Sequence, residues 1–437
     1  MALGFKPRWQ LQPGRAGASH RAHPPASRAP STRGAPPARG DALQPHPLRA
    51  APSPGAARPG ALQPRERRRP PRRSPHRPAG RRPRRARQAP QHRPARPQCP
   101  GVGGGFWRAR RLNVSSEMES PLRILIVGAG SVGQLYGLHL ARAGEEVHVL
   151  VRPRYAEGAR RGYRLYERRR DFKQHAIFTP DGVWTDAEEL PRGHFDAVIL
   201  AIPSTGLKGP WLASLARSLG DATLITLTPG LDDVAIIAEH IDRDQIVRGL
   251  ITSVSYPAPL PGESCPQPGT AYWFPPLTPA LFEGPSNRVT PIVNALKRGH
   301  MSSKSVRGLA EKAAFGSGLL MPIVAHMETV GWRLDRLRDE KLSELVATMS
   351  QIRAILEATL GASAPLPMRL LTPATVKLLT RIAPRVPPFN FEVYLQVHFT
   401  KVGAQTRMFL DDYVAKGQAH NLPTGAIAEL REQLGEA

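Results

Sequence analysis

A glycine-rich segment directly after an apolar run constrains the fold of this chain more than any other feature. Residues 128–133 read Gly-Ala-Gly-Ser-Val-Gly and follow the apolar residues 124–127. In this order the first glycine permits a tight turn, the second lets a pyrophosphate approach the backbone, and the third lets a helix pack closely on the strand. Residues 134–143 can form that helix, and residues 147–151 form a second β-rich run. The segment therefore predicts a dinucleotide site with the anion at the helix N-terminus.

Arg152 stands directly after the second β-rich run, where NAD-binding chains usually carry an acidic residue for the ribose 2′-hydroxyl. A guanidinium suits a 2′-phosphate instead. Arg152 and the nearby Arg154 could also be solvated loop charges, but the position after the second strand favours contact with the coenzyme. We therefore expect NADP as the cofactor.

The chain consists of two parts of very different composition. Residues 1–117 contain 26 Lys plus Arg against 3 Asp plus Glu, a net charge of +23, and 22 of the 47 prolines. Residues 118–437 hold the other 35 basic and 32 acidic residues, a net charge of +3. The first part shows almost no apolar periodicity and cannot build a core. We therefore expect an Arg/Pro-rich, disordered arm.

Three interpretations of this arm compete: a nucleic-acid-binding tail, an organelle-targeting peptide, and sequence upstream of the true start codon. We favour the last, because Met118 stands just before the first predicted strand and the Arg/Pro/Ala/Gly bias is typical of a GC-rich reading frame. The prolines also oppose the amphipathic helix of a transit peptide. An arm that is translated would bind polyanions without sequence specificity and with strong salt dependence.

The composition of residues 118–437 excludes several classes of protein. The near-neutral charge implies no specific nucleic-acid partner. The chain has only Cys99, in the arm, and Cys265, so a disulfide framework is excluded, and no Cys/His spacing suggests a metal. The longest apolar stretch, residues 313–324, is too short for a membrane span. We expect a cytoplasmic protein with no membrane partner and no signal peptide.

Strand-like runs alternate with helical stretches through the first half of residues 118–437. Such alternation predicts a parallel sheet covered by helices, with ligands at the carboxyl ends of the strands. Pro203 and Gly230 follow two of these strands, so we expect both beside the coenzyme. The predicted strands are residues 124–127, 147–151, 197–202, 223–227 and 246–253.

The pattern changes after about residue 305. Residues 256–291, rich in proline, glycine and aromatic residues, predict irregular strands, whereas residues 309–330 predict a long buried helix kinked at Pro322. Residues 342–360, 374–382 and 405–416 predict further helices. We expect an α/β fold in which a Rossmann-type NADP-binding domain, residues 118–305, precedes an all-helical substrate and dimerisation domain, residues 306–437. The substrate would occupy the cleft between them.

The order of these motifs resembles the ketopantoate reductase (2-dehydropantoate 2-reductase) family over nearly all of residues 122–435. The resemblance rests on the glycine-rich segment, on residues 144–152, on Lys312 near the start of the long helix and, more weakly, on residues 417–423. It implies reduction of a 2-oxo acid by NADPH, with Lys312 as the general acid toward the developing alkoxide. The residues expected to bind the coenzyme are Gly128, Ala129, Gly130, Ser131, Val132, Gly133, Arg152, Pro203 and Gly230.

Positions expected to bind the substrate depart from the family pattern. The family's Asn-Gly is Pro229-Gly230 here, and the asparagine expected one helical turn after the lysine falls on Gly316. The lysine usually found after the third sheet strand falls near Pro203. These losses remove side chains that hydrogen-bond the substrate.

The departures continue near the C-terminus. If Thr406 is the threonine that precedes the family's late glutamate, that glutamate falls on Arg407 and a substrate-binding serine falls on Leu395. Arg407 is then a candidate substrate contact, although an arginine cannot accept a hydrogen bond as a carboxylate does. Asp411 and Asp412 are adjacent on a predicted helix, do not face each other, and are expected on a solvated surface without a metal.

Coenzyme binding is therefore predicted to be intact, whereas the substrate-binding groups differ from those of the family. Because a site built to hydrogen-bond its substrate discriminates strongly, such losses change or abolish the substrate. The leading hypothesis is an NADPH-dependent reductase of another 2-oxo acid or carbonyl compound. The alternative is a non-catalytic NADPH-binding sensor or regulatory protein. The expected partners are a small-molecule substrate and, through the helical domain, a second copy in a homodimer.

Overall fold

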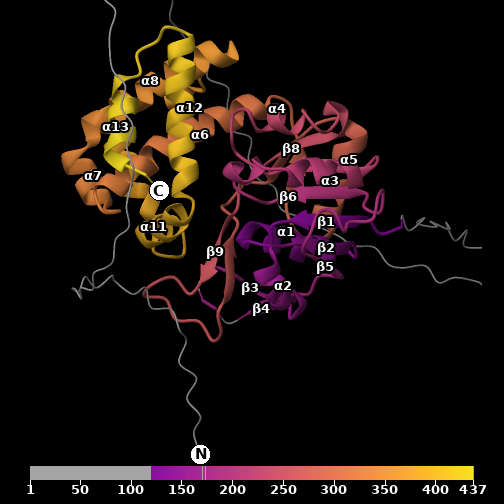
Figure 1. Cartoon of the computed structure of the whole chain (residues 1–437). Helices are drawn as coiled ribbons and strands as arrows, with labels where there is room; N and C mark the ends of the chain where they lie inside the picture. The colour runs from indigo at the N-terminus through magenta and orange to yellow at the C-terminus, as the bar shows by residue number, and fades with distance from the viewer. Residues whose placement is uncertain (1–119, 170, 173, 437) are drawn as a thin grey trace, which may run out of the picture. The chain divides into compact units, whose positions relative to one another are not determined.

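The computed structural model describes residues 120–169, 171–172 and 174–436. The predictions of a disordered arm over residues 1–117 and of a start at Met118 lie outside the described residues. Two sheets and a set of C-terminal helices form the described part, and Figure 1 shows those helices, orange to yellow, gathered apart from the strands of the larger sheet.

The larger sheet has eight strands in the order β12-β11-β8-β7-β6-β1-β2-β5. Its six strands from β5 to β8 are parallel and follow the 3-2-1-4-5-6 order of a Rossmann fold, while β11 runs antiparallel to β8. The strands are β1 Arg123–Val127, β2 Glu146–Leu150, β5 Gly182–Trp184, β6 Ala197–Leu200, β7 Thr223–Thr226, β8 Ile246–Leu250, β11 Ala280–Glu283 and β12 Ser303–Ser305.

Helices cover both faces of this sheet because its central strands are apolar on both faces. In β1, for example, Ile124 and Ile126 pack in one core cluster with Leu135 and Leu138 of α1, whereas Leu125 packs in another with Leu212 and Leu215 of α3. Parallel strands buried on both faces require such continuous apolar runs. The helices of this part are α1 Ser131–Arg142, α2 Pro153–Arg160, α3 Trp211–Leu219, α4 Asp233–Ile237 and α5 Ser286–Arg298, with short 3₁₀ turns at Ser204–Leu207 (η1) and Arg243–Gln245 (η2).

A second, four-stranded sheet has the order β4-β3-β10-β9. Its strands are β3 Tyr163–Glu167, β4 His175–Phe178, β9 Val254–Ala258 and β10 Gly269–Trp273. Tyr256 and Ala271 of this sheet share a small apolar core with Phe389 and the partly buried Tyr394. The second sheet therefore packs against the start of helix α11, which belongs to the C-terminal helices.

The C-terminal region is entirely helical among the residues that the structure describes beyond β12. Its core combines Phe315 and Val324 of α6 with Ile352 of α8, Phe409 of α12 and Ile427 of α13. The helices are α6 Leu309–Thr329, α7 Leu334–Glu340, α8 Leu342–Leu360, α9 Leu366–Arg369, α10 Pro373–Ile382, α11 Phe391–Lys401, α12 Gly403–Ala419 and α13 Gly425–Leu434, with a 3₁₀ turn η3 at Ala383–Arg385. Within the described residues no single helix is long and apolar enough to cross a membrane; only α6 and α7 taken together, with a 93° bend, meet the length and composition of a broken span.

The predicted fold class is confirmed, and all five predicted parallel strands and the long helices are present. The prediction for residues 256–291 missed helix α5, which begins at Ser286 and carries Pro291 in its second turn. Pro291 lies beyond the first turn of α5, so its missing N–H removes one backbone hydrogen bond, that to the carbonyl of residue 287, and the helix continues past it. Strands β3, β4 and β5 also went unpredicted, since they are short and lack a clear alternation of apolar and polar residues.

Candidate coenzyme and substrate site

The three glycines of the predicted dinucleotide loop differ in what surrounds them. Gly128 ends β1 with φ of +92°, and a Cβ there would lie 2.7 Å from Ile202 Cγ2. A Cβ on Gly133 would collide with the carbonyl oxygen of Gly128. A Cβ on Gly130 would meet nothing within 4 Å, because this residue faces open space. The first and third glycines are thus required by the fold, whereas the second leaves the backbone accessible.

The exposed Gly130 is the N-cap residue of α1, and no side chain caps this helix. The loop between β1 and α1 is held by Gln134, whose Nε2 donates to Ala129 O at 2.9 Å and whose Oε1 accepts from Thr270 Oγ1 at 2.5 Å. The predicted contacts Ser131 and Val132 form the first turn of α1. An anionic pyrophosphate fits this place, because uncapped N–H groups and an open backbone face the same space.

Arg152 lies where the sequence predicted it, at the end of β2 and as the N-cap residue of α2. Its side chain is exposed, and Arg154 lies with its guanidinium 4.8 Å from the centre of the Tyr155 ring. The first acidic residue of α2, Glu157, accepts a hydrogen bond from Arg161. The end of β2 therefore offers an unscreened cation, which fits a 2′-phosphate better than a ribose hydroxyl.

Two loops at the carboxyl edge of the sheet are joined by a buried carboxylate that sequence reasoning missed. Asp233 Oδ2 accepts hydrogen bonds from Ser204 Oγ at 2.6 Å and from Gly230 N at 2.7 Å. A side chain on Gly230 would collide with Asp233. Asp233 thus links the exposed Pro203, which precedes η1, to the Pro229-Gly230 turn. The amino-acid sequence contains little indication of this link, because Asp233 and Ser204 come together only on folding.

Helix α12 contacts both of these loops from the helical side. Gln405 Oε1 accepts a hydrogen bond from Ser204 N at 2.9 Å, and Lys416 Nζ donates to Asp232 Oδ2 at 2.8 Å. The carboxyl edges of β6 and β7 are therefore joined to the helical region by side chains about three helical turns apart on α12.

Lys312 lies exposed in the first turn of α6, and its Nζ donates to the Arg307 carbonyl at 3.3 Å. Within the described part of the chain it forms no ion pair. The N–H groups at the start of α6 are instead occupied by Glu283, whose carboxylate accepts from Gly308, Leu309 and Ala310. Gly316 follows Lys312 by four residues and faces open space. One exposed face of α6 thus carries the ammonium of Lys312 and, one helical turn later, a glycine with open space in place of a side chain.

Arg248 of β8 is a second cation that sequence reasoning missed. Burial lowers the pKa of its guanidinium, while the carboxylates of Asp233, Glu283 and Glu311 raise it. Glu311 Oε2 is buried without a hydrogen-bond partner in the structure. These groups connect the Asp233 network to the start of α6, so Lys312 follows a partly buried group of charges rather than lying on an isolated surface.

Arg407, the candidate substrate contact, is buried and donates four hydrogen bonds within the protein. Its acceptors are Gly403 O, Glu328 Oε1 at 2.9 Å, Leu434 O at 2.7 Å and Gly435 O at 2.8 Å. A guanidinium has five N–H groups, so little donor capacity remains for a ligand. Leu395 is also buried, in the core of the helical region.

A cavity of about 340 Å³ lies between η1 and the last two long helices. Thr205 and Lys208 line it from one side and Met408, Asp411 and Asp412 from α12. The prediction of a solvated surface holds for Asp411, which is exposed and pairs with Arg431, but Asp412 is only partly exposed. Burial raises the pKa of Asp412, and the nearby Asp232 raises it further.

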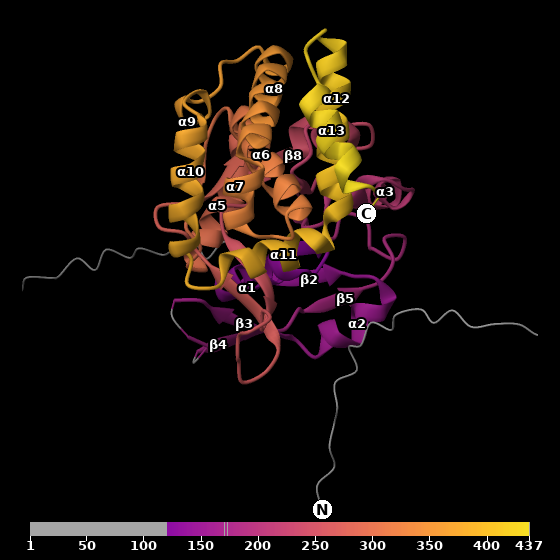
Figure 2. The same cartoon turned by 90° about the vertical axis from the view of Figure 1, so that its left-hand side faces the viewer.

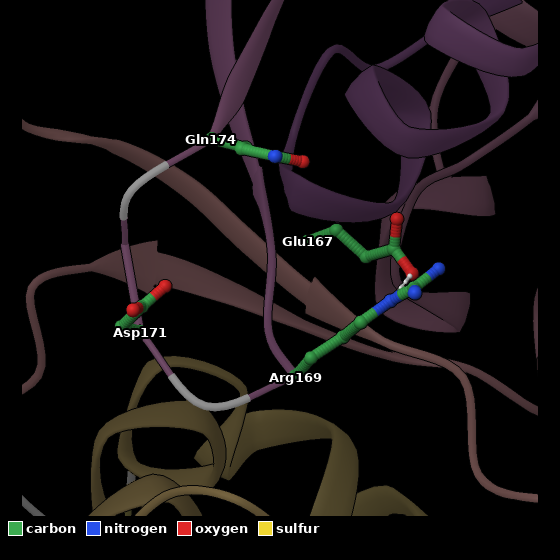
Figure 3. Close-up of a pocket in the computed structure, with 4 residues that line it drawn as sticks. All are labelled: Glu167, Arg169, Asp171 and Gln174. Carbon is green, nitrogen blue, oxygen red and sulfur yellow. Dashed lines mark hydrogen bonds and ion pairs between the residues drawn. The ribbon is translucent and has the colours of Figure 1, made fainter.

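A second cavity of about 340 Å³ lies away from the glycine loop, at the β3–β4 connection. Figure 3 shows Glu167 and Arg169 joined by a hydrogen bond of 2.9 Å at its rim, with Asp171 and Gln174 on the other side. These four side chains are polar, and Arg169 is neutralised by Glu167. Among the described residues, the side chains that line this cavity are therefore polar or charged.

One cluster has metal-ligand residue types: Glu146, His148 and His194 place ligand atoms within 4.8 Å of one another. However, Trp184 Nε1 donates to His148 Nδ1 at 3.2 Å, so Nδ1 is the acceptor and Nε2 carries the proton given to Glu146. A metal on Nε2 would require a proton on Nδ1 facing the indole N–H. The hydrogen bonds of His148 to Glu146 and Trp184 therefore favour a histidine paired with a carboxylate over a metal ligand.

Comparison with known proteins agrees with this geometry. Residues 124–264 match the family model "Ketopantoate reductase PanE/ApbA". The PanE/ApbA family ketopantoate reductase of Ralstonia eutropha JMP134 is 18% identical with a TM-score of 0.56, and the alignment covers 72% of this chain and 97% of that one. The 2-dehydropantoate 2-reductase of Methylococcus capsulatus is also 18% identical, with a TM-score of 0.53 and coverage of 72% and 99%.

A further solved structure with the same fold is D-mandelate dehydrogenase with NADH and anilino(oxo)acetate. It is 13% identical, with a TM-score of 0.56 and coverage of 72% of this chain and 97% of that one. A search of curated proteins found no match. At these identities the solved structures establish the shared fold, and the family model matches residues 124–264.

Proposed function

We propose, on the premise that this chain is a divergent member of the ketopantoate reductase PanE/ApbA family, that it is an NADPH-dependent reductase of a 2-oxo acid or related carbonyl compound. The observation that carries the proposal is the combination of an open, uncapped glycine loop at α1 with an exposed arginine after β2 that forms no ion pair within the described residues. A Rossmann sheet places both at the carboxyl edge, where a dinucleotide binds.

The coenzyme would be held by the backbone N–H groups of residues 130–133 and by Arg152. When bound, NADPH supplies the hydride. The exposed Gly130 lets the pyrophosphate approach, and the guanidinium of Arg152 would donate two hydrogen bonds to the 2′-phosphate. Pro203 and Gly230 would form the wall beside the coenzyme, with Asp233 holding their loops together.

Lys312 would act as the general acid. Its ammonium is exposed and, among the described residues, hydrogen-bonds a backbone carbonyl rather than a carboxylate, so it is free to approach a substrate oxygen. As the carbonyl carbon is reduced, a positive charge beside the oxygen stabilises the developing alkoxide, and the ammonium can give it a proton. The same charge would attract the carboxylate of a 2-oxo acid.

The substrate is proposed to differ from ketopantoate. Gly316 and Pro229 offer no side-chain hydrogen bond, and Arg407 is largely occupied by the protein. The open space at Gly316 suits a bulkier or less polar substituent than one recognised by an asparagine amide. We further propose the division into residues 118–305 and 306–437, a cytoplasmic location and a homodimer.

The experiment is to measure NADPH and NADH oxidation by the purified full chain with a panel of 2-oxo acids that includes ketopantoate. Coenzyme binding is followed on the same sample by fluorescence. We expect turnover with NADPH and a panel member other than ketopantoate. Turnover of ketopantoate would contradict the substrate proposal alone. Tight NADPH binding without turnover of any compound would favour the alternative, a sensor, which the missing polar groups at Gly316 and Pro229 also support.

A further inference from the structure

A group of exposed aliphatic side chains lies on the helical region, and none of them belongs to the residues proposed to act in reduction. It is formed by α9, α10 and the turn η3, which follow one another along one side of the helical region in Figure 2. Each of its large aliphatic side chains is between 50% and 63% exposed, which is unusual for so many neighbours in sequence. This apolar patch consists of Leu366, Leu370, Leu378, Leu379, Ile382 and Val386.

Helix α10 turns this patch outward because its inner face is already in use. Val376 and Thr380, one turn apart, are buried against the rest of the region, and Arg338 of α7 donates to the Thr380 carbonyl. Leu378 and Ile382, also one turn apart, lie on another face and are exposed. The patch therefore contributes little to the core, and its exposure follows from how α10 packs.

Within the segment that carries the patch, the charge has one sign. Residues 358–391 contain four basic residues and neither aspartate nor glutamate, a net charge of +4, whereas all of residues 118–437 carry only +3. Lys377 and Arg381 are one turn apart on α10, so a basic stripe runs beside the apolar one. All four basic side chains are exposed, and this basic fringe consists of Arg369, Lys377, Arg381 and Arg385.

We propose that this face of the helical region binds the surface of an anionic lipid bilayer, with the apolar patch entering the acyl boundary and the basic fringe contacting the headgroups. An amphipathic helix with aliphatic residues on one side and Lys or Arg on the other binds membranes in this way without crossing them. The proposal is independent of the reductase function. It replaces the expectation of no membrane partner with peripheral binding.

Two features favour lipid over a protein partner. The patch is wholly aliphatic, whereas the residues that dominate protein interfaces are enriched in aromatic side chains and depleted in leucine and valine. A second copy docked through the same patch would bring two sets of four cations together, because a two-fold interface pairs each surface with itself. Anionic headgroups instead neutralise the basic fringe.

The test places an environment-sensitive fluorophore at position 379 of the full chain, as Leu379→Cys with Cys99→Ser and Cys265→Ser. The control carries the same fluorophore at Leu277→Cys, because Leu277 is a fully exposed leucine in the β10–β11 connection. A local signal is needed because residues 1–117, with a net charge of +23, attract anionic vesicles by themselves. The probe used is vesicles of phosphatidylserine with phosphatidylcholine, compared with phosphatidylcholine alone.

We expect vesicles containing phosphatidylserine to shift the emission at position 379 to the blue and to leave position 277 unchanged. Leu378→Gln with Ile382→Gln should raise the lipid concentration needed for half the signal about tenfold, as expected for losing part of two buried aliphatic side chains. The matched variant Ile177→Gln with Leu277→Gln removes two exposed apolar residues elsewhere and should have no effect.

Two outcomes would overturn the proposal. The first is an unchanged signal at position 379 on vesicles that sediment with the protein. The second is a blue shift at position 379 without lipid that grows with protein concentration, which would assign the patch to a second copy of the chain.

Discussion

The glycine loop after β1 and the residues of α11 and α12 in the helical region differ in how their functional groups are supplied. The loop presents backbone N–H groups of consecutive residues, and its second glycine faces open space. On the helical side, Arg407 and Gln405 are bonded to other parts of the protein, and Leu395 lies in the core. A binding site made of backbone thus survives sequence divergence more readily than one assembled from side chains of distant segments.

The largest expected effect concerns Lys312, the exposed lysine of the helical region that we propose as the general acid. Lys312→Ala should reduce turnover by about 10²–10⁴-fold, the usual contribution of a positioned general acid, and leave NADPH affinity unchanged. Steady-state kinetics and a coenzyme titration measure the two quantities. Lys304→Ala removes a nearby exposed lysine on β12 and serves as the control. Turnover that survives in Lys312→Ala would remove the role assigned to this lysine.

Arg407→Met tests whether this arginine stabilises the fold or binds the substrate. Loss of its hydrogen bonds leaves the Gly403, Leu434 and Gly435 carbonyls and the Glu328 carboxylate without their donor. We expect the free energy of unfolding to fall by roughly 2–4 kcal/mol, since Glu328 is partly solvated. Urea denaturation measures it.

Arg336→Met, which breaks an exposed pair with Glu340, should leave the free energy of unfolding nearly unchanged and is the control for Arg407→Met. The opposite pattern for Arg407→Met, a changed KM at unchanged stability, would make Arg407 a substrate ligand. The helical side would then retain more of its binding groups than the geometry indicates.

Two glycine variants separate fold from coenzyme binding within the loop itself. Gly133→Ala forces a methyl group against the Gly128 carbonyl and should cost about 1–3 kcal/mol of stability. Gly130→Ala meets no neighbour, so we expect stability to change by less than about 1 kcal/mol while NADPH affinity falls about tenfold. Thermal unfolding and coenzyme titration distinguish them. Unchanged affinity in Gly130→Ala would mean that no phosphate approaches this residue.

Arg152→Gln changes only the recognition of one phosphate and tests the choice of coenzyme. Loss of a charge-assisted contact to the 2′-phosphate should weaken NADPH binding about 10- to 100-fold and leave NADH binding unaltered. Arg154→Gln, which loses only its stacking on Tyr155, is the matched variant and should be nearly neutral. Equal weakening of both coenzymes would contradict recognition of the 2′-phosphate by Arg152.

Much of the fold could be predicted from the sequence because its signals are local. The strands β1, β2, β6, β7 and β8 are continuous apolar runs, and α8 was predicted at its observed bounds by helical spacing. The second sheet could not be predicted, because its strands are short and β3 pairs with β10 more than a hundred residues later. Helix α5 was missed because the prolines and glycines of residues 256–291 indicated irregular structure, although α5 continues past Pro291 with one backbone hydrogen bond fewer.

By itself the sequence determined the parallel sheet, the glycine loop and the position of Arg152, because each depends on residues within one turn or strand. Only the tertiary structure decided that Asp233 joins Ser204 to Gly230, that Arg407 is bonded to Glu328 and the C-terminal carbonyls, and that α10 exposes its leucines. The physical reason is that hydrogen bonds and burial of these side chains depend on partners that the chain brings together only on folding. The backbone of a nucleotide loop needs no such partner, whereas a substrate site does.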